Sequence, residues 1–213
     1  MSTITASAAA LPDLDVDAVV IGVAKGTDGP VPLGGAAALD TALGGRLASV
    51  LASLGATGQP GDVVRFATLG ALKAPTVVAT GVGPVDPKGE LDHEALRRAA
   101  GAAVRALAGT ARVATTLALA PGAPTPESLR AAAEGSLLGA YSFDEFRTAS
   151  GADRRPPVRE ITLVVERDED LPAAEAALNR ARIVVDAVNL VRDLVNTPPS
   201  HLPPARLADL ATE

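Results

Sequence analysis

Residues 18–23, with the sequence AVVIGV, form a short and continuous apolar run that decides the class of fold. The run is bounded by Asp17 and by residues 25–29, which are rich in turn-forming types. An apolar run of this length between polar boundaries is typical of a strand that is buried on both faces. Similar runs recur along the chain at residues 63–69, 76–80, 113–119 and 161–165.

Helical patterns lie between these runs. The clearest pattern places six apolar residues on one stripe, namely Leu96, Ala99, Ala100, Ala103, Val104 and Leu107. Asp92 is the expected N-cap of this helix, and Gly109 lies just past its expected end. A second helix is expected to begin at residues 125–127 (TPE), where a capping hydroxyl precedes a proline. An earlier helix is expected over about residues 38–54, ending at Gly55.

Strands that alternate with helices predict an α/β layered domain with a mainly parallel or mixed sheet. The runs at residues 63–69 and 76–80 are separated only by residues 70–75, which favours an antiparallel hairpin. The sequence therefore predicts a mixed sheet.

The last long helix, expected over residues 172–195, differs from the others because its apolar residues occupy two stripes. One stripe carries Leu178, Ala181, Val185 and Val188, and the other carries Ala177, Val184, Val191 and Leu194. A helix that is apolar over most of its circumference needs more cover than one small sheet provides. We therefore expect a second partner surface for this helix.

Residues 196–199 (NTPP) are expected to end this helix, because proline removes a backbone donor and disfavours helix in the preceding residue. A new helical pattern begins near Pro203 and continues towards Glu213 without a C-cap. We therefore expect that the chain is a truncated piece of a longer protein.

Composition narrows the classes of function. The chain has 213 residues, 47% of them hydrophobic, no cysteine and a net charge of −6. Disulfides and thiolate metal sites are thereby excluded, and no basic patch for a nucleic-acid backbone is evident. The first fifteen residues lack a secretory signal, and no apolar stretch reaches the roughly eighteen residues of a membrane helix. We expect a soluble, cytoplasmic protein with no membrane partner.

Two glycine-containing segments are candidate ligand loops. Residues 80–83 (TGVG) follow an expected strand, as a phosphate-binding turn would, but Asp86 stands where the dinucleotide motif needs its third glycine. Gly34 and Gly35 form a second close-approach position. A glycine turn that leaves a strand is the commoner explanation of residues 80–83, and Gly34 and Gly35 could simply form a loop.

The remaining reactive residue types are scattered. His93 and His201 lie far apart without an HExxH motif, and His93 is expected in the first turn of a helix. Ser136 lies inside a helical pattern, and so it is not a nucleophile elbow. Residues 168–170 (DED) could bind a cation, although a charge run before a helix is usually a solvated cap region. No constellation supports catalysis by this chain.

Two longer segments carry a resemblance to a known family. Residues 189–202 (NLVRDLVNTPPSHL) resemble the "ARDLVNTPP" junction that precedes the catalytic domain of cytosol (leucyl) aminopeptidases, and residues 133–143 (AEGSLLGAYSF) are similar to the family's "EG-x-LLG-x-Y-x-F". Residues 17–23 and 80–83 look like the family's first strand and its "GLG" turn. The resemblance covers nearly the whole chain.

The resemblance implies a macro-domain-like mixed sheet flanked by helices over residues 1–170, a connecting helix and linker over 171–198, and the truncated start of the catalytic domain over 199–213. It also implies a hexameric parent whose catalytic domain binds two divalent metal ions, zinc or manganese, and removes amino-terminal residues from peptides. No "NTDAEGR" segment or lysine-bearing glycine motif occurs here. No catalytic, cofactor-binding or metal residue is therefore assigned.

We expect a structural and assembly module of a leucyl-type aminopeptidase, with its own catalytic domain as partner. The alternative is a ligand-binding module that uses Gly34, Gly35 and residues 81–83 for ADP-ribose or a nucleotide, as macro domains do. DNA binding is a third hypothesis, which the acidic balance disfavours. We expect no aminopeptidase activity from the chain alone and no tight site for nucleotide or ADP-ribose.

Overall fold

The computed structural model describes residues 2–86, 91–119, 124–146 and 154–212. The strands within these residues are β1 (Thr3–Ser7), β2 (Ala18–Lys25), β3 (Pro30–Pro32), β4 (Val63–Ala67), β5 (Thr76–Gly83), β6 (Arg112–Thr115) and β7 (Glu160–Val164). The α-helices are α1 (Ala37–Ala42), α2 (Leu47–Ser53), α3 (His93–Ala106), α4 (Pro126–Gly139), α5 (Leu171–Asn196) and α6 (Pro204–Leu210).

The strands form one mixed sheet in the order β1-β7-β6-β2-β5-β4, with β3 paired to β2. The pairings of β4 with β5 and of β2 with β3 are antiparallel, and the other pairings are parallel. The expected mixed sheet and the expected hairpin are both confirmed. β1 has no counterpart in the sequence prediction, because Ile4 is the only large apolar residue in its sequence TITAS.

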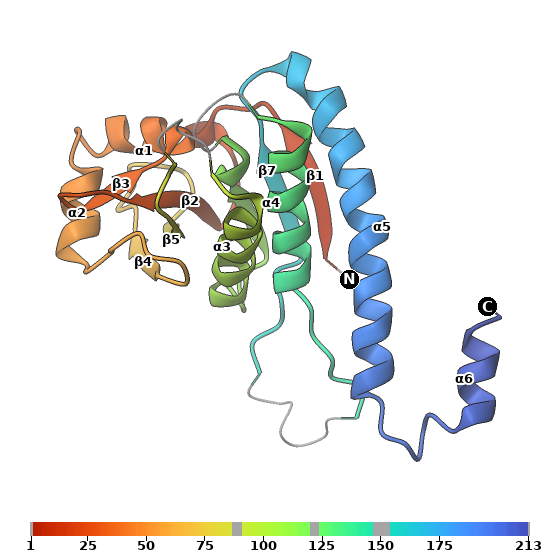
Figure 1. Ribbon diagram of the computed structural model, residues 1–213. Coiled ribbons are helices and arrows are strands. Elements are labelled where there is room, and N and C mark those ends of the chain that lie inside the picture. Colours follow the sequence, from red (N-terminus) through yellow and green to blue (C-terminus); the bar gives the residue numbers. More distant parts are fainter. Residues whose placement is uncertain (1, 87–90, 120–123, 147–153, 213) are drawn as a thin grey trace.

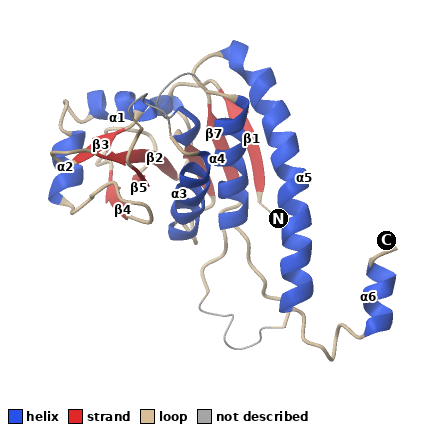
Figure 2. Ribbon diagram, viewed as in Figure 1, coloured by secondary structure: helices blue, strands red, loops and turns tan. Residues whose placement is uncertain are grey.

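Strand β2 lies in the middle of the sheet and is buried on both faces, as its apolar sequence predicts. Ala18 and Val20 pack into the core beneath α3, α4 and α5, while Val19 and Ile21 pack into the core beneath α1 and α2. The two-residue period of a strand sends neighbouring side chains to opposite faces. Helices therefore cover both sides of the sheet (Figures 1 and 2).

Local sequence sets the helix boundaries as expected. The Asp92 carboxylate accepts a hydrogen bond from the backbone N–H of Glu94 at 3.2 Å, which caps α3. Thr125 accepts from the N–H of Ser128 at 3.1 Å, and the Ser128 hydroxyl accepts from the N–H of Thr125 at 3.0 Å. This reciprocal pair begins α4 at Pro126.

Two predicted boundaries were wrong. The helix expected over residues 38–54 is two helices, α1 and α2, because Gly44 and Gly45 between them have φ values of 65° and 73°. A left-handed backbone does not continue a right-handed helix. The strand expected over residues 113–119 ends at Thr115, and a 3₁₀ turn follows at Leu117–Leu119.

Helix α5 runs from Leu171 to Asn196, close to its expected bounds, and packs on α4 and the edge strand β1 (Figure 1). Its buried residues are Ala174, Ala177, Leu178, Ala181 and Val185. Ala177, expected on the stripe of Val184 and Val191, is therefore on the buried side of the helix, and Val188, expected on the stripe of Val185, is only half-buried. Two adjacent stripes of a helix point in similar directions. A residue at their border, such as Ala177, can therefore belong to either stripe.

The expected helix near Pro203 is α6, but it ends at Leu210 rather than running to the end of the sequence. Its residues include no buried side chain. Among the described residues, no helix combines the length and hydropathy needed to cross a membrane.

Candidate functional site

The glycines of residues 80–83 lie inside the sheet, as the last residues of β5 rather than in a turn after it. A Cβ atom on Gly81 would lie 1.9 Å from the carbonyl oxygen of Gln59 and 2.8 Å from the carbonyl carbon of Gly58. The space that the missing side chain leaves is therefore filled by the chain's own backbone.

Close packing within the chain also explains the second candidate loop, which is formed by Gly34 and Gly35. A Cβ atom on Gly35 would lie 2.3 Å from the Cβ of Thr116, and one on Gly34 would lie 2.8 Å from the carbonyl oxygen of Leu119. These glycines let the 3₁₀ turn Gly34–Ala36 pack on Thr116, which follows β6, and on the turn Leu117–Leu119. Their close approach serves packing, and it gives no support to a phosphate site.

The scattered reactive residues stay apart in the fold. His93 is the first residue of α3, as expected, whereas the His201 ring contacts Phe146 at an interplanar angle of 49°, with 4.6 Å between ring centroids. Residues 168–170 form a 3₁₀ turn in which Arg167 pairs with Asp170 at 3.2 Å and with Glu169. Across the described ranges, no group of three or more His, Cys, Asp or Glu side chains could hold a metal ion.

Ser136 lies within α4 and is fully buried, and its hydroxyl oxygen has no hydrogen-bond partner in the described part of the chain. A buried helical hydroxyl cannot reach a substrate carbonyl, which agrees with the sequence interpretation.

Of the two neighbouring arginines, Arg97 and Arg98, only Arg98 is largely exposed to solvent. Arg98 is exposed and pairs with Glu94 at 2.9 Å, but Arg97 pairs with Glu134 of α4 at 2.8 Å. Glu134 is only 4% exposed, and Arg130 also approaches it at 3.0 Å. This ion pair fastens α3 to α4.

A polar cluster joins the end of α4 to the last turns of α5. The Tyr141 hydroxyl donates to the Asp193 carboxylate at 2.7 Å and accepts from the Asn196 amide at 3.0 Å. The guanidinium of Arg192 lies 5.1 Å from the Tyr141 ring centroid and donates to the carbonyl oxygen of Leu138 at 3.2 Å. Burial, and then the hydrogen bond to Asp193, raise the pKa of Tyr141 above its ordinary value of 10.0.

Contacts between tilted aromatic rings extend this connection beyond α5. Phe143 and Phe146 have ring centroids 5.9 Å apart, and Phe146 in turn contacts His201. The residues that follow α4 are thus joined to the segment that follows α5. We call Tyr141, Asp193, Asn196 and Arg192 the junction cluster.

One face of α5 is apolar and exposed. Ile183 is 72% exposed, Val191 58% and Val195 78%, and Val184 and Leu190 are also exposed. Residues spaced by three, four and seven positions lie on one side of a helix. We call these five residues the outer face of α5. Their exposure confirms the expected outer stripe at Val184 and Val191, while Leu194 is half-buried.

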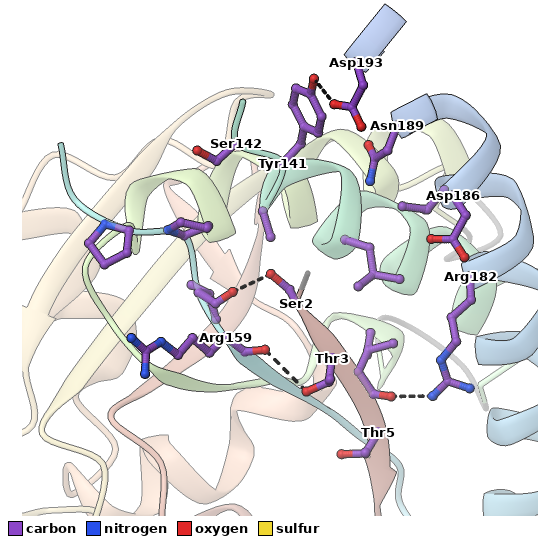
Figure 3. Close-up of a pocket in the computed structure, with 17 residues that line it drawn as sticks. Ser2, Thr3, Thr5, Tyr141, Ser142, Arg159, Arg182, Asp186, Asn189 and Asp193 are labelled. Atoms are coloured by element: carbon purple, nitrogen blue, oxygen red, sulfur yellow. Dashed lines mark hydrogen bonds between the residues drawn. The ribbon is translucent and has the colours of Figure 1, made fainter. Parts of the chain in front are cut away.

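A side of α5 other than its outer face borders a cavity of about 670 Å³ (Figure 3). The cavity lies between α5, the end of α4, the beginning of β1 and residues 156–159. Asp186, Asn189 and Asp193 project towards it from α5 (Figure 3). The Arg182 guanidinium donates to the carbonyl oxygen of Ile4 at 2.5 Å, at the outer edge of β1. Neither the cavity nor the junction cluster is evident from the amino-acid sequence.

Comparison with known proteins gives this arrangement a context. The model of the N-terminal domain of the cytosol aminopeptidase family matches residues 20–150. The chain belongs to the cytosol aminopeptidase family. A probable cytosol aminopeptidase of Streptomyces griseus is 42% identical over 100% of the chain and 42% of its own length. One of Micrococcus luteus is 47% identical over 98% of the chain and 40% of its own length.

This family member therefore spans about two fifths of the length of these curated relatives. Solved structures show the same fold. A mutant of tomato leucine aminopeptidase has a TM-score of 0.75 at 21% identity, covering 100% of the chain and 42% of that chain. The bottromycin maturation enzyme BotP has a TM-score of 0.69 at 28% identity, covering 92% and 36%.

The two segments that carry the aminopeptidase resemblance meet in space. Tyr141 belongs to residues 133–143, and Asp193 and Asn196 belong to residues 189–202. The junction cluster is thus formed by both family motifs. The fold, rather than either motif alone, brings their polar side chains together.

Proposed function

We propose that this chain is the non-catalytic, amino-terminal structural and assembly module of a leucyl-type metallo-aminopeptidase, which removes amino-terminal residues from peptides. In this proposal residues 1–170 are a macro-like α/β domain, residues 171–198 are the connecting helix and linker, and residues 199–213 begin the catalytic domain. Family membership and the greater length of the relatives support this division.

The outer face of α5 is the observation that carries the proposal. Five large apolar side chains lie along one side of a helix whose opposite side packs on α4 and β1. Complete burial of a fully exposed side chain of this kind is worth about 1.5–3 kcal/mol. Covering the exposed parts of these five side chains recovers a share of that free energy, so the face favours a covering surface. We assign that surface to the remaining three fifths of a chain such as those of the relatives, with which α5 is continuous.

Hydrolysis, in this proposal, belongs to that remaining part. Two divalent metal ions, zinc or manganese, would activate water there, and the structure of BotP in complex with Mn supports a metal in a relative. The described residues offer no ligand group that fits such ions. A cytoplasmic, hexameric parent completes the proposal, and the relatives' name, cytosol aminopeptidase, supports the first of these properties.

The competing functions receive less support. ADP-ribose or nucleotide binding would need the glycines at positions 34, 35 and 81, whose open side is filled by other atoms of the chain, namely backbone at Gly34 and Gly81 and the Thr116 side chain at Gly35. DNA binding would need a basic surface, and the net charge is −6.

Cysteine labelling tests the role of the outer face. The chain has no cysteine, so Val191→Cys introduces a single thiol. We expect rapid alkylation of this thiol in residues 1–213 and at least tenfold slower alkylation in the full-length parent, with site-resolved detection by mass spectrometry. Glu175→Cys, on an exposed position of α5 nearer its beginning, is the matched control and should react equally in both. Equal rates at position 191 in both proteins would overturn the proposed docking.

A further inference from the structure

A smaller cavity, of about 250 Å³, lies where the end of α3 meets the turn after α4 and residues 154–157. Its apolar floor includes Val104 and Ala140, which are buried. Three arginines line it, namely Arg105, Arg154 and Arg155. We call it the arginine cavity. A gathering of three cations is unusual in a chain whose net charge is −6.

Arg155 is positioned by its backbone and by its aliphatic stem. The N–H of Gly109 donates to the carbonyl oxygen of Pro156 at 2.7 Å, which fastens the neighbouring backbone to the end of α3. A Cβ atom on Gly109 would lie 3.2 Å from the Cδ of Arg155 and 3.4 Å from its Cβ. The stem of Arg155 therefore lies against this glycine, and the fold limits where its guanidinium can reach.

Arg105 lies on the last turn of α3. A Cβ atom on Gly101, one turn earlier, would lie 3.3 Å from the Nη1 of Arg105, so the side chain extends back along the helix. Gly101 itself packs on α4, since a Cβ atom on Gly139 would lie 2.6 Å from the carbonyl oxygen of Gly101. The guanidinium of Arg105 is thus beside the contact between α3 and α4 that borders the cavity.

Arg154 is oriented by a carboxylate. Its guanidinium pairs with Asp144 at 2.7 Å, and the Ser142 hydroxyl donates to the other carboxylate oxygen of Asp144. Arg154 is therefore already neutralised.

The other two charges of the arginine cavity are not balanced. Arg105 and Arg155 make no hydrogen bond or ion pair among the described residues. Like charges on one cavity repel each other, and an anion between them replaces this repulsion with attraction. The lining is thus suited to a ligand with about two negative charges.

The size of the cavity restricts the ligand further. Small-molecule sites usually have volumes of about 300–1,000 Å³, so about 250 Å³ suits a compact anion better than a nucleotide. The planar guanidinium matches the oxygens of a phosphate group, to which it can donate two parallel hydrogen bonds. A phosphate group carries about 1.5 to 2 negative charges at pH 7, close to the two unpaired charges of the lining.

We propose that the arginine cavity binds a small phosphate anion, either inorganic phosphate or pyrophosphate, through the guanidiniums of Arg105 and Arg155. Arg154, held by Asp144, completes the positive wall. None of these residues belongs to α5 or to the segment after it, so this binding is independent of the function proposed above.

Calorimetric titration of residues 1–213 tests the ligand class. Potassium phosphate and potassium pyrophosphate are the probes, and potassium chloride at the same ionic strength is the control. We expect saturable binding of at least one probe with a Kd below about 1 mM, and the tighter probe identifies the anion. No saturable binding of either probe, or an equal response to chloride, would overturn the proposal. Tighter binding of a short DNA duplex than of either probe would also overturn it, because the arginines would then serve a nucleic-acid backbone.

Three variants locate the site. Arg105→Gln and Arg155→Gln each remove one unpaired charge and should weaken binding of the tighter anion about tenfold, since hydrogen bonds to charged groups are the strong ones. Arg180→Gln is the matched control, because Arg180 is an exposed arginine of α5 outside the lining and has no partner among the described residues. This variant should leave binding unchanged. An equal loss in Arg180→Gln, or no loss in either cavity variant, would contradict the assignment.

Discussion

Gly81 lies in strand β5 where the backbone of Gln59 passes so close that a side-chain carbon has no room. The Gly81 N–H also donates to the carbonyl oxygen of Asp62 at 2.8 Å, and the Gly83 N–H donates to that of Gly58. Residues 58–62 are thereby held against the end of β5. The absent side chain is what allows this contact.

Replacing Gly81 with alanine should therefore destabilise the fold strongly. We expect Gly81→Ala to lower the free energy of unfolding by about 3 kcal/mol or more, because backbone rather than a flexible side chain blocks the new carbon. Gly44→Ala is the control, since its φ of 65° is strained for alanine but no atom lies within 4 Å of the added carbon. That variant should lose about 1 kcal/mol. Urea unfolding measures both, and equal losses would contradict the steric account.

Tyr141 can be followed directly, because it is the only tyrosine in the chain. Its pKa is raised by burial and then by the hydrogen bond to Asp193, so the phenol should ionise above its ordinary value of 10.0. The neutral phenol is favoured in the folded state. Its contribution to stability is therefore complete below the unfolded pKa and is lost as pH rises through the folded pKa.

An ultraviolet absorbance titration of the phenol measures this shift. Asp193→Asn removes the neighbouring charge but keeps an acceptor, and should bring the pKa of Tyr141 back towards its ordinary value. Asp168→Asn, an exposed site at the other end of α5, should leave the titration unchanged. A Tyr141 pKa that is ordinary in the unsubstituted chain would contradict the partial burial of the Tyr141 hydroxyl and its hydrogen bond to Asp193.

Among the elements, α5 has the most unusual distribution of apolar residues. Val185 is buried against the core, and Val191 on the outer face is 58% exposed. We expect Val185→Ala to lower the free energy of unfolding by about 1–2.5 kcal/mol, and Val191→Ser to change it by less than about 0.5 kcal/mol.

The same two substitutions distinguish an effect on folding stability from an effect on self-association. In residues 1–213 alone, the outer face of α5 has no cover from the rest of a parent chain, and we expect concentration-dependent self-association through it. Val191→Ser should weaken this association, whereas Val185→Ala should not. Sedimentation velocity over a range of concentrations measures the effect, and a strictly monomeric unsubstituted chain would count against the prediction.

Sequence predicts these elements where the signal is local. The caps at Asp92 and Thr125 use side chains within three residues of the helix start, and the apolar run of β2 identifies a central strand by itself. The break between α1 and α2 was missed although Gly44 and Gly45 are adjacent, because the apolar pattern continues across them. Strand β1 was missed because Ile4 is its only large apolar residue, and what defines it as a strand is its pairing with β7, which lies far along the chain.

At the scale of the whole molecule, the site could not be predicted from spacing. Tyr141 and Asp193 are separated by 52 positions, and the cavity combines β1, α4 and α5. Only the packing of α5 on α4 brings these residues together. Family resemblance indicated both segments, but not that their side chains form one cluster.

The whole chain should be inactive as a peptidase under the proposed division of labour. We expect no leucyl-anilide turnover by residues 1–213 with excess manganese or zinc, because two-metal hydrolysis needs a ligand set that the described residues do not provide. A blank preparation from the same host controls for contaminating enzymes. Turnover that follows this polypeptide through purification and exceeds the blank would refute the assignment.

The position of β1 at the sheet edge has a consequence for synthesis on the ribosome. The N–H of Thr3 pairs with the carbonyl oxygen of Arg159 at 2.8 Å, across 156 positions. At translation rates of roughly 5–20 residues per second, this partner emerges roughly eight to thirty seconds after Thr3. The strand made first is thus among the last to be paired. The nascent chain must keep this uncharged segment soluble until residue 160 has left the exit tunnel.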